Sequence, residues 1–303
     1  MGSPLATIFA SGFFANAPVR TAIIVGGGAA FVSAVVGVFT VMRGQSFAGH
    51  ALADASSAGG SASFLVGVNP LLGFLGMALI AGAAMGLADT RDAGERDLVT
   101  GIVLGAGLGL AALFLYLDIT SMSTTGAAIT VLFGSMFAIP ASIIPLTLLV
   151  MVGALTVIAV IHRPLLLSSL SPEIARAQGV RVRLIGLLHV LALSLAVALS
   201  AMTIGAILST ALLIGPAAAG LRLADRPGRA VIVSIAIGLV ATWGGILLAY
   251  DSFYWTPGHG WPVSFFIVTL VLIFYVLAVL LTRASRGRSG HSSGPHLSKP
   301  CRT

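Results

Sequence analysis

The sequence predicts an all-α, polytopic transmembrane helical bundle. Of its 303 residues, 57% are hydrophobic and 8% are charged, and the mean hydropathy is +1.07. The nine acidic and sixteen basic residues gather in short stretches between long apolar runs. Because a water-soluble domain needs charged residues to cover its surface, this composition excludes a soluble globular protein. The charged stretches are the expected loops between membrane spans.

Apolar runs long enough to cross a bilayer recur along the chain. A hydrocarbon core about 30 Å thick needs roughly 20 residues of helix, and this length predicts about eight spans, or up to about ten with two weaker runs. The clear runs are 21–42, 71–89, 98–117, 141–163, 184–202, 204–222, 230–250 and 262–282, and the weaker runs are 48–68 and 124–139. Residues 1–282 are therefore expected to form one transmembrane domain in the cell membrane.

The distribution of arginine predicts the orientation of the second half, because cytoplasmic loops retain Arg and Lys. Three arginine clusters lie in this half of the chain. The clusters are Arg176, Arg181 and Arg183; Arg222, Arg226 and Arg229; and Arg283, Arg286 and Arg288. The intervening loop Asp251–Trp261 has no Arg or Lys but four aromatic residues, as expected of an outer face. The C-terminus is predicted to be cytosolic, and the N-terminus stays unassigned.

The last residues, 283–303, read as a disordered, basic cytosolic tail. They are rich in Ser and Gly and lack apolar periodicity, so burial cannot offset the entropy of ordering them. His291 and His296 could form a metal-binding tail, although a solvated flexible segment is the preferred interpretation. The single cysteine, Cys301, excludes an intramolecular disulfide and a cysteine-rich zinc site.

A short amphipathic helix is predicted between two spans, after 141–163. Ser171 suits the N-cap, Pro172 the first helical position, Glu173 the first turn and Gly179 the stop. Two interpretations remain open. The helix is either a capped connector or a coupling helix that docks on a soluble ATPase and transmits its motion.

The weak run 48–68 carries two ionisable residues, His50 and Asp54. They are four apart, so their side chains lie on one helical face, and Ser57 and Ser61 continue the polar stripe. Imidazole with carboxylate suits zinc, manganese or ferrous iron, whereas copper(I) and calcium prefer other donor sets. The alternative is a structural hydrogen bond between the pair without an ion. Intramembrane ionisable residues favour the functional interpretation.

Three stretches, in matching order and spacing, resemble the ABC-3 metal-permease family over about residues 20–282. The first is 41–60, where an Arg and a Ser-Phe precede the polar pair. The second places Glu173, Ala175 and Gly179 in an acid–Ala–Gly pattern. The third is 203–220, represented by Gly205, Leu208, Ala211, Leu212, Leu213, Ile214, Pro216, Ala217 and Ala218. The family usually places Asp before His, so the order in this chain is exchanged.

The resemblance implies that residues 1–282 are the permease domain of an ATP-binding-cassette importer for divalent metal ions, either manganese, zinc or iron. Such a permease dimerises, binds a cytosolic ATPase on each half and receives metal from an extracytoplasmic binding protein. It implies a transient transport site at His50 and Asp54 and no permanently bound cofactor. The coupling role would fall on Ser171, Pro172, Glu173, Ala175, Arg176 and Gly179.

The third stretch also carries helix-disrupting residues. Gly215-Pro216 interrupts the hydrogen-bond ladder, since Pro lacks the N–H and crowds the preceding turn. We expect a kink at Pro216 that shapes the transport pathway, with Gly205 at the start of the same stretch.

Motifs for catalysis are missing from the sequence, which has no HExxH, GxSxG or Walker P-loop, and its only lysine is Lys299. The chain is therefore predicted not to be an enzyme. A secondary active transporter of a small solute or ion is the alternative, but no inverted repeat supports it. The net charge of +7 indicates contact with anionic lipid head groups rather than with nucleic acid.

Overall fold

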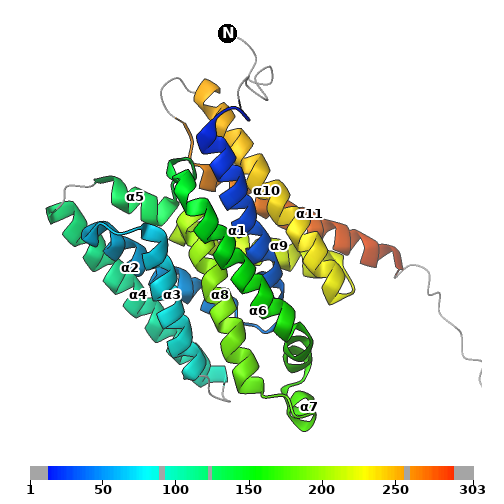
Figure 1. Ribbon diagram of the computed structural model, residues 1–303. Helices are drawn as coiled ribbons and strands as arrows, with labels where there is room; N and C mark the ends of the chain where they lie inside the picture. Colours follow the sequence, from blue (N-terminus) through cyan, green and yellow to red (C-terminus); the bar gives the residue numbers. More distant parts are fainter. Residues whose placement is uncertain (1–12, 89–92, 122–124, 256–259, 290–303) are drawn as a thin grey trace, which may run out of the picture.

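The structure is a computed structural model that describes residues 13–88, 93–121, 125–255 and 260–289 (Figure 1). Every element within these ranges is helical. In order they are α1 Ala17–Met42, α2 Ser46–Val66, α3 Pro70–Leu87, α4 Ala93–Ser121, α5 Thr125–Phe133, η2 Met136–Ala138, η3 Ala141–Ile143, α6 Ile144–Leu170, α7 Pro172–Ala177, α8 Val182–Ile204, α9 Ala206–Leu223, α10 Pro227–Trp255 and α11 Val263–Ser289. Eight of the described helices are long and apolar enough to cross a membrane. The predicted all-α bundle of about eight spans is confirmed.

The two weaker runs behave differently from each other. Run 48–68 forms one helix, α2, which is less apolar than the eight spans and packs against α3, α4, α8 and α9. Run 124–139 does not cross, because α5 ends at Phe133 and Gly134 follows with a φ of 75°. At 1.5 Å per residue, α5 is about half as long as a bilayer core is thick. The upper limit of ten spans is therefore not reached.

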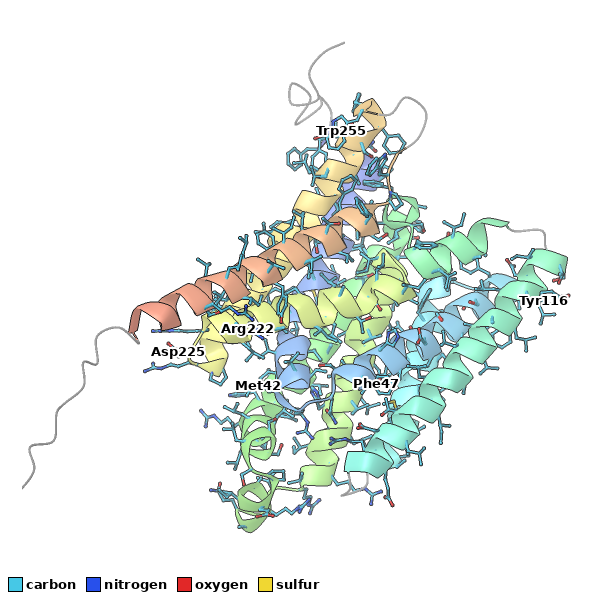
Figure 2. The ribbon with its side chains drawn as sticks, turned by 180° about the vertical axis from the view of Figure 1, so that it is seen from behind. Met42, Phe47, Tyr116, Arg222, Asp225 and Trp255 are labelled. Atoms are coloured by element: carbon cyan, nitrogen blue, oxygen red, sulfur yellow. The ribbon has the colours of Figure 1, made fainter. Side chains whose placement is uncertain are left out.

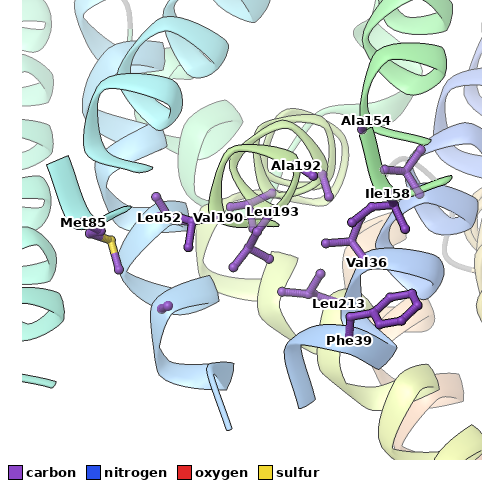
Figure 3. Packing of buried hydrophobic residues seen from close by; sticks show 14 of the residues in the cluster. Val36, Phe39, Leu52, Met85, Ala154, Ile158, Val190, Ala192, Leu193 and Leu213 are labelled. Atoms are coloured by element: carbon purple, nitrogen blue, oxygen red, sulfur yellow. The ribbon is translucent and has the colours of Figure 1, made fainter. Parts of the chain in front are cut away.

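The interior of the bundle is built around α1 and α8, the most enclosed of the spans. Side chains of α2, α3, α6 and α9 pack against these two helices in one buried cluster, part of which is drawn in Figure 3. Leu52 of α2, Leu193 of α8 and Leu213 of α9 are fully buried in this cluster. Small residues bring the helices close. A methyl group added at Gly59 of α2 would collide with the Gly73 carbonyl of α3, so these two helices pack in direct backbone contact.

One end of the bundle carries a cluster of aromatic side chains. Figure 1 places α7 at one end, and Figure 2 shows Trp255 at the opposite end. There Trp261 stacks on Phe266 with ring centroids 6.0 Å apart, and Trp255 meets the same ring edge-on. Such clustering is typical of a membrane–water interface.

Helix α11 continues past Arg283, where the tail is expected to begin, and ends at Ser289. Arginine and alanine are good helix formers, and basic residues suit the C-terminal end of a helix, so the helix persists beyond its apolar part. Residues 290–303, with the two tail histidines and Cys301, lie outside the described residues.

Candidate functional site

His50 and Asp54 lie on one face of α2, as their spacing predicts. His50 Nε2 is 3.7 Å from Asp54 Oδ2, and the side chains are 43% and 6% exposed respectively. Among the described residues, no hydrogen bond reaches Asp54 Oδ2. The pair thus joins a partly exposed imidazole to a buried carboxylate oxygen.

Neighbouring helices pack closely around the pair. Gly107 of α4 lies so near that a methyl group there would come within 2.6 Å of the Ala55 amide nitrogen. On the other side, Thr210 of α9 places its Oγ1 3.5 Å from His50 Nδ1. Helices α4 and α9 thus both pack beside the pair, and the imidazole lies 3.7 Å from the Asp54 carboxylate through Nε2 and 3.5 Å from the Thr210 hydroxyl through Nδ1.

The donor set suits a passing ion better than a resident one. Over the part of the chain that the structure describes, no group of three or more His, Cys, Asp or Glu side chains is placed to hold a metal. A four-coordinate zinc or a six-coordinate manganese would need further ligands from water or from another molecule. Weak binding favours transport, because an ion has to leave its site as readily as it enters. That His50 and Asp54 bind an ion stays a prediction.

A second intramembrane histidine, His189 of α8, has a structural partner. Its ring is fully buried, and its Nε2 is 3.3 Å from Thr40 Oγ1 of α1. The Thr40 hydroxyl donates its only hydrogen to the Val36 carbonyl, 2.9 Å away. His189 Nε2 must then carry the hydrogen in this contact. His189 is therefore hydrogen-bonded to a neighbouring helix of the bundle.

The predicted short helix exists as α7, with the expected caps. The Ser171 side chain accepts a hydrogen bond from the Ile174 amide at 3.4 Å, Pro172 occupies the first turn, and Gly179 follows with a φ of 81°. Ala175 is fully buried, whereas Glu173 and Arg176 are exposed. One face of α7 is therefore anchored to the bundle through Ala175, and the face that carries Glu173 and Arg176 is exposed.

The residues proposed for the pathway lie along α9. Gly205, with a φ of 89° and a ψ of 155°, separates α8 from α9. α9 then runs to Leu223 with Pro216 inside it, and Gly215 packs against Val271 of α11. Their role in the pathway and the kink at Pro216 stay predictions.

Sequence reasoning missed the partner of Gly205. Gly134, which follows α5, lies against the backbone of Thr203, Ile204 and Gly205. The break after α5 and the break before α9 therefore contact each other. The only local signal was a lone glycine in Phe133-Gly134-Ser135, which gives no indication of its distant partner.

Replacing Gly205 with alanine should destabilise the bundle by at least about 2 kcal/mol. Its backbone conformation is one that almost only glycine adopts, and a methyl group there would collide with the Leu132 carbonyl. The matched control is Gly76→Ala in α3, where an added methyl group meets nothing within 4 Å. Thermal unfolding in detergent should show a large drop for Gly205→Ala and none for the control. Equal midpoints for the two variants would refute this strain.

Comparisons with known proteins extend over most of the chain. It matches the ABC 3 transport family over residues 16–282. It is 30% identical over 284 residues to the manganese import system permease protein ScaB of Streptococcus pneumoniae, covering 94% of this chain and 95% of that one. It is 26% identical over 223 residues to the high-affinity zinc uptake system membrane protein ZnuB of Haemophilus influenzae, covering 73% and 84%.

A solved structure shares the arrangement of helices. The structure of PsaBC from Streptococcus pneumoniae in complex with Fab has a TM-score of 0.75 and 25% sequence identity, with 89% of this chain and 94% of that chain covered. The family match begins at Asn16, beside α1, and ends within α11, so it includes α2, α7 and α9, the helices that carry the candidate site residues.

Proposed function

The chain belongs to the ABC 3 transport family, and from this premise we propose that it is the membrane-spanning permease subunit of an importer for divalent metal ions. The observation that carries the proposal is similarity to ScaB over 94% of the chain. The chain is a multi-pass protein of the cell membrane. We place its C-terminus in the cytosol, where its arginine clusters would also lie.

The transported ion is most consistent with manganese or zinc. The relatives are named for manganese and for zinc. The imidazole and carboxylate of His50 and Asp54 are donors that either ion accepts, and ferrous iron shares this preference. The exchanged order of the two residues keeps both on one helical face, so binding survives the exchange while the preference among ions is free to differ.

ATP hydrolysis would belong to a separate cytosolic subunit, because the sequence has no Walker P-loop. The exposed charged face of α7 offers that subunit a docking site. At the opposite end of the bundle, an extracytoplasmic binding protein would deliver the metal.

A second copy of the chain would complete the pathway. The imidazole of His50 is partly exposed and stands beside Thr210 of α9. Thr210 also lines an open apolar groove of about 470 Å³ between α9 and α11. A homodimer that covers this face would bring two such pairs together and supply further ligands beyond those that the described residues of one chain place at the pair.

Uptake in whole cells tests this function. A strain lacking the chain should lose high-affinity uptake of radioactive manganese, zinc or both, and loss of its ATPase should have the same effect. Complementation with the chain restores uptake only when the ATPase is present. Uptake that needs this chain but no ATPase would instead favour the secondary transporter.

A further inference from the structure

The turn between α1 and α2 is hydrogen-bonded to both helices. Gly44 and Gln45 donate their amide hydrogens to the carbonyls of Val41 and Thr40, at 3.1 and 2.9 Å, and the Gln45 carbonyl accepts from the Ala48 amide at 3.1 Å. Met42 and Phe47, on either side of the turn, are labelled in Figure 2. Any displacement of this turn therefore moves the start of α2, which carries His50 within its first two turns.

The side chain of Arg43 ties this turn to α6. Its Nε donates to Gln45 Oε1 at 3.2 Å, and its Nη1 donates to Ser168 Oγ at 3.1 Å. Gln45 is 8% exposed and Ser168 is 4% exposed, so both acceptors are shielded from water. Hydrogen bonds from a charged donor in such a setting are strong and directional.

The hydroxyl of Ser168 is oriented to accept the hydrogen bond from Arg43. It donates its hydrogen to the Leu165 carbonyl at 3.0 Å, which leaves its lone pairs for Arg43. Ser169 makes the same kind of bond to the same carbonyl, at 2.6 Å. The two adjacent serines thus share residue type and backbone contact, but it is Ser168 to which Arg43 donates.

Ser168 lies in the last turn of α6, directly before Ser171 and α7. We propose that Arg43 is a positioning residue that mechanically links the ATPase-docking segment to the helix bearing the ion site. A force on α7 moves the end of α6, Ser168 carries the guanidinium with it, and Gln45 passes the shift to α2. We call the contact of Arg43 with Gln45 and Ser168 the arginine clamp. This inference rests on the proposed function.

Transport coupling tests the clamp. The chain and its ATPase are reconstituted together in proteoliposomes, and Mn²⁺ uptake is measured against ATP hydrolysed. Ser168→Ala and Arg43→Gln should lower the Mn²⁺ carried per ATP by about tenfold, the loss expected when a charged hydrogen bond is removed. Ser169→Ala should keep the native ratio. Arg43→Lys retains charge but lacks the two-pronged fork, so it should be intermediate.

A purely structural role predicts another pattern. Less folded protein lowers uptake and hydrolysis together and leaves their ratio unchanged, which would overturn the clamp. So would equal ratios for Ser168→Ala and Ser169→Ala. Arg43→Lys keeps the test decisive if Arg43→Gln does not fold.

A second readout needs no ion flux. With Cys301→Ser removing the native thiol, Phe47→Cys, at an exposed position of α2, reports ATP-dependent maleimide labelling. ATP should change the labelling rate several-fold in the otherwise native complex, and Ser168→Ala should abolish that change. A wild-type complex that moves neither Mn²⁺ nor Zn²⁺ would refute the proposed function, while labelling that ignores ATP or Ser168→Ala would refute the clamp.

Discussion

Alanine at His50 or at Asp54 is expected to reduce metal uptake by about a hundredfold, the scale at which loss of a metal-site group acts. Among the described residues the pair has no third strong ligand nearby, so either loss leaves an ion with one strong protein ligand. Protein yield and dimerisation should persist, because a transient ligand contributes little to folding. Radioactive uptake with Western quantification of the chain measures both quantities.

A structural pair would give the reverse result. Removing His50 would strand the buried Asp54 carboxylate, which costs about 1–3 kcal/mol and lowers the amount of folded protein. The matched control is Ser61→Ala on the same helix, since the Ser61 hydroxyl only donates to the Ser57 carbonyl. Native uptake by both alanine variants would remove His50 and Asp54 from the pathway.

The exchanged order offers a further test of the same site. His50→Asp combined with Asp54→His restores the usual order of the family and keeps both groups on one face. A metal-contacting pair should retain substantial uptake with a shifted preference among manganese, zinc and iron. Loss of uptake as complete as in the single alanine variants would show that the order itself matters.

Reversing both charges on α7 is expected to lower the amount of co-purifying ATPase by about tenfold or more. Glu173 and Arg176 are exposed, and Ala175 holds the helix to the bundle, so Glu173→Arg with Arg176→Glu should leave folding within about 0.5 kcal/mol of native. Like charges that face each other across a docking surface weaken association strongly. Affinity purification of the permease followed by quantification of the ATPase measures the effect.

The control makes the same charge change elsewhere. Asp225→Arg with Arg226→Glu alters two exposed residues between α9 and α10, and Asp225 is labelled in Figure 2. This variant should retain the ATPase. Unchanged co-purification and uptake in the α7 variant would leave α7 as a capped connector.

Features set by neighbouring residues could be predicted from sequence. The caps of α7 depend on Ser171, Pro172 and Gly179, which act within one short segment. The facing of His50 and Asp54 depends only on helical spacing. Both are local consequences of backbone geometry, so the sequence alone was sufficient for them.

Contacts between distant segments could not be predicted. Thr210 beside His50, and Ser168 bonded to Arg43, depend on which helices become neighbours. In a membrane, every span is apolar, so hydropathy does not indicate which faces pair. Run 124–139 shows the same limit. Its helix breaks at Gly134, which contacts the backbone of Gly205, and the composition of the run gives no indication of this contact.

Purified chain and ATPase in proteoliposomes provide the most direct test of the importer function. With ATP supplied on the side of the ATPase, the account predicts uptake of Mn²⁺ or Zn²⁺ that requires both proteins and stops when ATP is replaced by a non-hydrolysable analogue. Metal uptake by the chain alone, driven by an ion gradient and indifferent to ATP, would contradict it.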